Sequence, residues 1–218
     1  MRARSLTQKN SRTWITVGIV LLVIAVGIGL LFKKHPSKLF DRLPVKNKDI
    51  VFFGDSHFEL FEAAEMLNDR RIKMRGFSGR TSSELLTHVD EIVKGTPRLV
   101  FLIAGANDAF RGRGVDAYLN DMQQLIGRIK VQSTELIPVS IPPATDPQLQ
   151  ARITEFNNAL ELLCEERQLS FVDLDPVLMK NGTLDPALTF DEIHLNEDGY
   201  ARIVPLLKPH IRAAAPAQ

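Results

Sequence analysis

Short apolar runs alternate with longer amphipathic stretches along residues 48–213, and this alternation predicts strands and helices in turn. The predicted strands cover residues 50–53, 72–75, 99–104, 136–141 and 170–173. The predicted helices cover residues 60–67, 81–93, 115–130, 149–167 and a last helix from about residue 198, in which Pro205 predicts a kink or an early end. The pattern therefore predicts an α/β fold with a mostly parallel five-stranded sheet that helices cover on both faces.

In the stretch 49–67, the spacing of apolar residues changes at Ser56. Before this residue, 50–53 is an apolar run typical of a buried strand, which Gly54 ends. After it, apolar residues recur with helical spacing at Leu60, Ala63, Ala64 and Leu67. A serine between a strand and a helix is either a nucleophile at a ligand-binding edge of the sheet or the N-cap of the helix.

The amino-terminal part of the chain differs in composition from the rest. Residues 14–32 contain no charged side chain and are long enough to cross a membrane. Because no small-residue cleavage site follows this run, an uncleaved anchor is preferred over a signal peptide. The predicted organisation is a basic tail 1–13, a transmembrane anchor 14–32, a tether 33–47, a catalytic domain 48–213 and a tail 214–218.

The short basic tail resists translocation, which predicts a single-pass protein of the bacterial inner membrane with its domain facing the periplasm or the exterior. The domain is long enough for one α/β core. The chain carries 27 basic and 26 acidic residues, so its charge indicates no nucleic-acid partner. Cys164 is the single cysteine and falls within a helical pattern, which predicts a buried thiol and excludes an intramolecular disulfide.

Polar residues with complementary chemistry follow the predicted strands or lie in late loops. These residues are Ser56, Gly79, Asn107, Asp191 and His194. Acyl transfer needs a hydroxyl nucleophile, an imidazole that takes its proton, a carboxylate that orients the imidazole, and donors for the oxyanion. Asp191 and His194 are three residues apart, so one turn would bring the carboxylate to Nδ1 while Nε2 faces Ser56.

At these positions the chain resembles the SGNH hydrolase superfamily, also called GDSL esterases and lipases, over about residues 48–211. Its motifs stand here as Gly54-Asp55-Ser56, Gly79, Gly105-Ala106-Asn107-Asp108 and Asp191 to Asn196. The resemblance implies a flavodoxin-like three-layer α/β/α fold and a Ser56–His194–Asp191 triad. It also implies an oxyanion hole from the Ser56 and Gly79 amides and the Asn107 side chain, with neither metal nor organic cofactor.

The expected activity is hydrolysis of short-acyl carboxylic esters on a cell-envelope carbohydrate or lipid. An O-acyltransferase would use the same residues, because a sugar hydroxyl can replace water. A metal-dependent phosphoesterase is an alternative, because the chain has aspartates and histidines that could coordinate metal ions. These are Asp55, His57, Asp108, Asp191 and His194. A tethered binding module without turnover is a further alternative. His57 stands where the family commonly has an aliphatic residue, and it either lines the pocket or only occupies the first helical turn.

Overall fold

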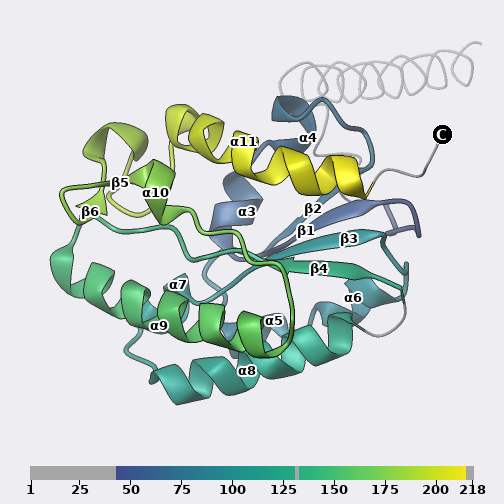
Figure 1. The fold of residues 1–218 in the computed structure, drawn as a ribbon, viewed down its shortest axis with the longest axis horizontal. Coiled ribbons are helices and arrows are strands. Elements are labelled where there is room, and N and C mark those ends of the chain that lie inside the picture. Colours follow the sequence, from purple (N-terminus) through teal and green to yellow (C-terminus); the bar gives the residue numbers. More distant parts are fainter. Residues whose placement is uncertain (1–42, 131–132, 215–218) are drawn as a thin grey trace, which may run out of the picture. The chain divides into compact units, whose positions relative to one another are not determined.

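The computed structural model describes residues 43–130 and 133–214, in which a parallel sheet forms the central layer (Figure 1). Its strands are β1 (Ile50–Gly54), β2 (Ile72–Gly76), β3 (Leu99–Ile103) and β4 (Glu135–Pro138), in the order β2-β1-β3-β4. All three pairings are parallel. Strands β2 and β3 lie on opposite sides of β1, so the direction in which strands are added reverses at β1. The loops after β1 and β3 therefore diverge, and in open α/β sheets ligands bind at this point.

Helices cover both faces of the sheet, which gives three layers (Figure 1). One face carries α5 (Ser82–Leu85), α6 (Val89–Val93), α7 (Ala106–Phe110), α8 (Val115–Ile129) and α9 (Pro147–Glu166). The other carries α3 (Ser56–Leu60), α4 (Ala63–Met66), α10 (Asp175–Leu178) and α11 (Glu197–Ala213). Between α10 and α11 lie the hairpin strands β5 (Met179–Lys180) and β6 (Thr183–Leu184) and the 3-10 helix η1 (Pro186–Leu188).

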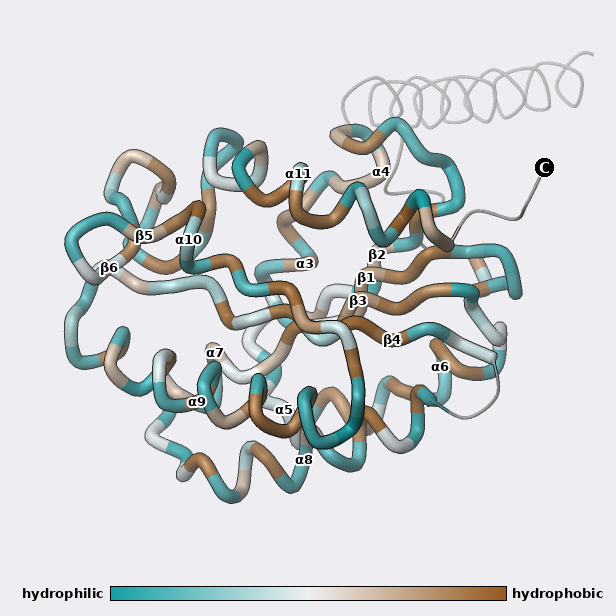
Figure 2. The backbone as a smooth tube through the Cα atoms, in the orientation of Figure 1, coloured by the Kyte–Doolittle hydropathy of each residue, from teal (hydrophilic) through white to brown (hydrophobic). Residues whose placement is uncertain are grey.

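The central strands β1 and β3 carry no polar side chain because each face of the sheet has its own core. Val51, Phe53 and Val100 belong to the core under α5, α8 and α9, while Phe52 and Phe101 belong to the core under α3 and α11. Successive strand side chains point to opposite faces, so a run of five apolar residues serves both. In the hydropathy colouring, β1 and β3 are mostly hydrophobic, whereas the helices alternate between hydrophilic and hydrophobic residues along their length (Figure 2).

The sheet of the described residues has four strands instead of the predicted five. The segment 170–173 pairs through a single parallel bridge between Val172 and Val139, the residue that follows β4. Pro138 ends β4 and has no N–H to donate, and Ser140, two residues further on, uses its hydroxyl to accept from the Leu174 N–H. The fifth position is therefore occupied by an extended segment too briefly paired to form a strand.

Two predicted helices are broken in the structure. The stretch 60–67 divides because Phe61 adopts an extended conformation after α3, and Phe61 packs with Phe58 on the ring of Phe52. Leu60, which helical spacing placed in the core, is 42% exposed as a result. The stretch 81–93 divides into α5 and α6. In contrast, α11 continues through Pro205 instead of ending there.

The predicted tail 1–13, the anchor 14–32 and most of the tether lie outside the described residues. Within 43–130 and 133–214, no helix combines the length and the apolar character that crossing a bilayer requires. Val45, in the predicted tether, is buried in the core beneath α5 and α8. Cys164 on α9 is buried, as predicted, and burial raises the pKa of its thiol to about 12.

Candidate active site

Ser56 is the first residue of α3 and follows β1 after a single linking residue, Asp55. Asp55 is the N-cap, since its carboxylate accepts a 3.0 Å hydrogen bond from the His57 N–H. The interpretation of Ser56 as the cap is therefore wrong, and its hydroxyl is available for another role. The main chain of α3 can lie this close to the sheet because Gly76 of β2 has no side chain; a Cβ there would lie 2.1 Å from the Glu59 nitrogen.

Ser56, His194 and Asp191 form a continuous hydrogen-bonded series. The Ser56 Oγ lies 2.8 Å from the His194 Nε2, and the His194 Nδ1 lies 2.6 Å from the Asp191 Oδ2. The second Asp191 oxygen accepts from the His194 N–H at 2.7 Å. A carboxylate on Nδ1 fixes the imidazole so that Nε2 can accept a proton from the serine.

The acidic end of this series is open to solvent. The side chain of Asp191 is 42% exposed and that of His194 is 25% exposed, whereas Ser56 is buried. Partial burial raises the pKa of Asp191, but hydrogen bonds from the His194 side chain and N–H outweigh it and hold the pKa below its ordinary value. The Asp191 carboxylate is therefore ionised at neutral pH.

Two further predicted residues, Gly79 and Asn107, meet beside the serine helix. Gly79 has a φ of 73°, which a side chain would disfavour. Asn107 lies on α7, and its Nδ2 donates a 3.0 Å hydrogen bond to the carbonyl of Arg80, next to Gly79. Within residues 43–130 and 133–214, the N–H groups of Ser56 and Gly79 donate to no protein acceptor, and the Asn107 amide has a second hydrogen to give.

Sequence reasoning missed the side chains that hold the Gly79 loop. Glu59 of α3 accepts from the Ser78 N–H at 2.8 Å, and Arg111, just after α7, donates to the Gly79 carbonyl at 2.7 Å. The loop is therefore fixed on both sides of Gly79 by the elements that carry Ser56 and Asn107. No motif reveals these contacts, because they join residues 19 and 32 positions apart.

A buried ionic network ties the start of α5, which follows the Gly79 loop, to α7, which carries Asn107. Asp108 accepts from the Ser82 N–H at 2.7 Å and from the Ser82 hydroxyl at 2.8 Å. Arg113 contacts both Asp108 and Asp121, and its distance to Asp121 is 2.8 Å. Because Asp108 is fully buried, each of these hydrogen bonds and ion pairs offsets the cost of burying its polar atoms.

The residues considered as metal ligands bind one another or other groups. The His57 Nδ1 lies 3.0 Å from the Asp55 Oδ1, and both side chains are buried. Among the described ranges no three His, Cys, Asp or Glu side chains converge as a metal site would require. The His57 ring lies beside that of His194, with 5.4 Å between ring centroids, and Tyr200 donates to the His57 carbonyl at 2.7 Å.

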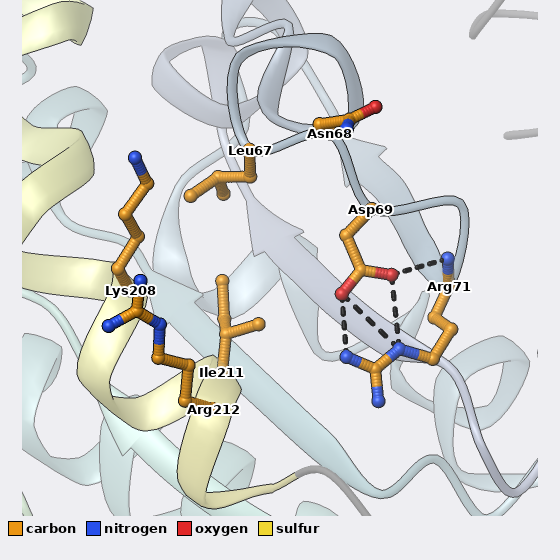
Figure 3. A pocket seen from close by; sticks show the side chains of 7 residues that line it. All are labelled: Leu67, Asn68, Asp69, Arg71, Lys208, Ile211 and Arg212. Carbon is orange, nitrogen blue, oxygen red and sulfur yellow. Dashed lines mark hydrogen bonds and ion pairs between the residues drawn. The ribbon is translucent and has the colours of Figure 1, made fainter.

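Two cavities flank the sheet at different ends. One, of about 330 Å³, is lined by residues of the catalytic loop, α7 and the start of α9, among them Ala109, Leu149 and Ile193. The other, of about 270 Å³, lies between α11 and the turn before β2 (Figure 3), where Asp69 and Arg71 form a two-pronged ion pair. That turn precedes the amino end of β2, whereas Ser56 follows the carboxyl end of β1, so the second cavity is not part of the site.

A hydroxyl, an imidazole and a carboxylate in series at the carboxyl edge of a parallel sheet are the arrangement used by hydrolases with a serine nucleophile. The chain belongs to the GDSL-like lipase/acylhydrolase family, whose sequence profile matches residues 58–202. The matched region begins two residues after Ser56. The match therefore does not include this serine, whose assignment rests on the structure and on the Gly54-Asp55-Ser56 motif. The resemblance seen in the sequence is thus confirmed at the level of the family.

Solved structures share the fold at low sequence identity. A GDSL-like lipase from Bacteroides thetaiotaomicron superposes with a TM-score of 0.71 and 23% identity over 84% of this chain and 98% of its own. The lipase/acylhydrolase from Enterococcus faecalis has a TM-score of 0.69 and 23% identity over 78% and 99%. These likenesses establish the three-layer α/β architecture.

A curated relative is much longer than the region it shares. The chain is 26% identical to an N-acylneuraminate cytidylyltransferase of Escherichia coli over 160 residues, which is 70% of this chain and 38% of that protein. The chain therefore spans about two fifths of the length of this relative. The activity in that protein's name describes the whole of it and is not carried over to this chain.

Proposed function

We propose that the protein is a serine esterase in which Ser56 is the nucleophile, His194 the general base and acid, and Asp191 the residue that orients the imidazole. The observation that carries the proposal is the hydrogen-bonded series through Ser56, His194 and Asp191, with distances of 2.8 Å and 2.6 Å. Such a series activates a hydroxyl that is otherwise a poor nucleophile.

In the first half of the reaction, the Ser56 Oγ attacks the ester carbonyl carbon while its proton passes to the His194 Nε2. The carbonyl electron pair moves onto oxygen, and the resulting oxyanion accepts hydrogen bonds from the Ser56 and Gly79 N–H groups and the Asn107 Nδ2. Collapse of this intermediate breaks the bond to the alcohol oxygen, which takes the proton from His194. The acyl group remains on Ser56.

In the second half, a water molecule gives a proton to His194 and attacks the acyl carbon. The second oxyanion uses the same donors, and its collapse releases the carboxylic acid and returns the proton to Ser56. Asp191 stays ionised through both halves, in keeping with its lowered pKa. Each step uses groups that the described residues supply.

The proposed substrates are short-acyl esters on a cell-envelope carbohydrate or lipid. The uncharged run 14–32 supports a single-pass anchor of the bacterial inner membrane, with the domain on the periplasmic or outer side. Acyl transfer to a sugar hydroxyl would follow the same route with a different acceptor in the second half. Product analysis with and without a glycan acceptor distinguishes hydrolysis from transfer.

The experiment that tests the proposal compares two serine variants on an aryl acetate. Ser56→Ala should fold and lose turnover, whereas Ser170→Ala, which changes an exposed serine away from the site, should remain active. A fluorophosphonate should label the wild type on Ser56 and leave the Ser56→Ala variant unlabelled. Turnover by Ser56→Ala, or labelling at another serine, would contradict the assignment.

A further inference from the structure

The cavity of about 330 Å³ is lined by residues that lie next to His194 and close to Asn107 in the sequence. Ile193 in its wall directly precedes His194, and Ala109 follows Asn107 by two residues. Its volume falls at the lower end of the range of ligand pockets, roughly 300–1,000 Å³. We propose that this cavity, termed the alcohol pocket, binds the alcohol part of the ester and that this alcohol is an uncharged sugar; the inference rests on the proposed esterase function.

The position beside His194 assigns the pocket to the alcohol instead of the acyl group. His194 must hand its proton to the alcohol oxygen as the ester bond breaks, so this oxygen lies against the imidazole. Glu192 and Ile193 are the two residues before His194 and line the pocket. Glu192 holds a φ of 77°, and its carbonyl accepts from the Thr145 N–H at 3.0 Å, which fixes this part of the loop.

The lining supplies what recognition of a sugar needs. Phe110 is 70% exposed and offers a ring face to the C–H groups of a sugar ring. Gln148 and Asp146 stand at the start of α9, and their planar side chains suit hydroxyls, which both donate and accept. One Asp146 oxygen already accepts from the Leu149 N–H at 2.7 Å, and its other oxygen and the Gln148 amide would find no hydrogen-bond partner in an acyl chain, which is costly once they are desolvated.

Arg152 is the cation among the residues that line the pocket, and its guanidinium is held in place. The Arg152 Nη2 donates to the Arg113 carbonyl at 2.9 Å. Because Arg113 also holds Asp108, the guanidinium of Arg152 is fixed relative to the Asn107 helix.

The charge of the pocket favours a neutral alcohol over a phospholipid headgroup. Its charged side chains are Asp146, Arg152 and Glu192, so two carboxylates face one guanidinium and leave a net charge of −1. A phosphate-bearing alcohol would meet like charge there, whereas hydroxyls would find acceptors. The pocket thus selects a sugar ester over a lysophospholipid.

The test uses the full chain, an O-acetylated methyl glycoside series of neutral hexoses, and an aryl acetate that lacks a sugar. Phe110→Ala and Gln148→Ala should each lower the ratio of glycoside kcat/KM to aryl acetate kcat/KM by about tenfold, mainly through the KM for the glycoside. Leu162→Ala and Gln124→Ala, which change exposed residues elsewhere on α9 and α8, should leave the ratio unchanged.

An unchanged ratio in both pocket variants would overturn the alcohol pocket. The same holds if the wild type hydrolyses the aryl acetate but none of the glycosides, or if it prefers a lysophospholipid to all of them. If the wild type did not hydrolyse the aryl acetate, this result would instead contradict the esterase proposal. The aryl acetate thus separates failure of the pocket assignment from failure of the proposed function.

Discussion

The side chain of Asn107 donates to the carbonyl of Arg80 across 3.0 Å, and this bond joins the helix after β3 to the loop after β2. One hydrogen of the amide is used in this contact, and the other remains for a ligand. Asn107 therefore has two roles that one substitution would remove together, namely fixing the loop and donating to a developing oxyanion. These roles leave different signatures in kinetics and in stability.

Replacing Asn107 tests its share in oxyanion stabilisation. Asn107→Ala should lower kcat by about 10²–10³-fold with little change in KM, because a donor to the oxyanion acts mainly in the transition state. Loss of the bond to Arg80 should cost about 1 kcal/mol of unfolding free energy. Asn107→Asp should be worse for kcat, since a carboxylate repels the oxyanion. Steady-state kinetics and thermal melts on the same samples give both numbers; normal kcat with lowered stability would remove Asn107 from the site.

Arg111 should act as a positioning residue through the Gly79 carbonyl. Arg111→Ala should lower kcat about tenfold with KM nearly constant, because a displaced Gly79 N–H stabilises the oxyanion less well. Arg111→Lys should restore part of the loss, since lysine can also donate to a carbonyl. The matched control is Arg128→Ala, which removes an exposed arginine bonded to the Leu86 carbonyl and Asp90. Equal effects of the two alanine variants on kcat would argue against a positioning role for Arg111.

The dependence of kcat/KM on pH tests the His194–Asp191 pair. His194 must be neutral to accept the Ser56 proton, so kcat/KM should rise with pH as the imidazole loses its proton. Asp191 should add no second limb near neutral pH, because its pKa lies below its ordinary value and it is already ionised. Asp191→Asn should lower kcat by about 10³–10⁴-fold. A rate that stays flat from about pH 5 to 8 in the wild type would contradict the assignment of His194 as the base.

The close approach of α3 to β2 can be tested with a pair of glycine variants. A Cβ at Gly76 would lie 2.1 Å from the nitrogen and 2.3 Å from the Cα of Glu59, which are backbone atoms that can yield only if α3 moves. Gly76→Ala should therefore cost about 3 kcal/mol of unfolding free energy and reduce activity, since α3 carries Ser56. Gly127→Ala, on α8 with open space around it, should stabilise the protein by about 1 kcal/mol. Denaturant unfolding and turnover on both variants check this, and wild-type stability in Gly76→Ala would refute the close contact.

The sequence predicted those parts of the fold whose signal is local. The runs at β1 and β3 are apolar at every position, and the long helices α8 and α9 repeat their apolar residues over several turns, so both kinds of element were predicted correctly. The stretch after Ser56 was predicted incorrectly as one helix because Phe61 turns into the core toward Phe52, a contact that no helical period encodes. The fifth strand was overpredicted for a similar reason, since its pairing depends on Pro138 of a neighbouring segment.

The residues of the candidate site also differ in whether the sequence alone could predict them. Ser56 and His194 could be paired from sequence because the chemistry of acyl transfer names the residue types it needs. Glu59 and Arg111 could not, because they act through backbone groups of a loop that lies far from them in the chain. Residues that take part in the reaction can be recognised by their residue type. Residues that only position a loop can be recognised only from the folded structure.

The rate at which Cys164 reacts with a thiol reagent reports how often α9 becomes exposed to solvent. Cys164 is the single cysteine of the chain, it is buried, and its thiol pKa of about 12 leaves almost no thiolate at neutral pH. A thiol reagent can therefore react only during excursions that expose α9 to solvent, so the labelling rate reports the free energy of that opening. Because α9 also carries Gln148 and Arg152, a sugar ester that protects Cys164 from labelling would report its own binding without any turnover.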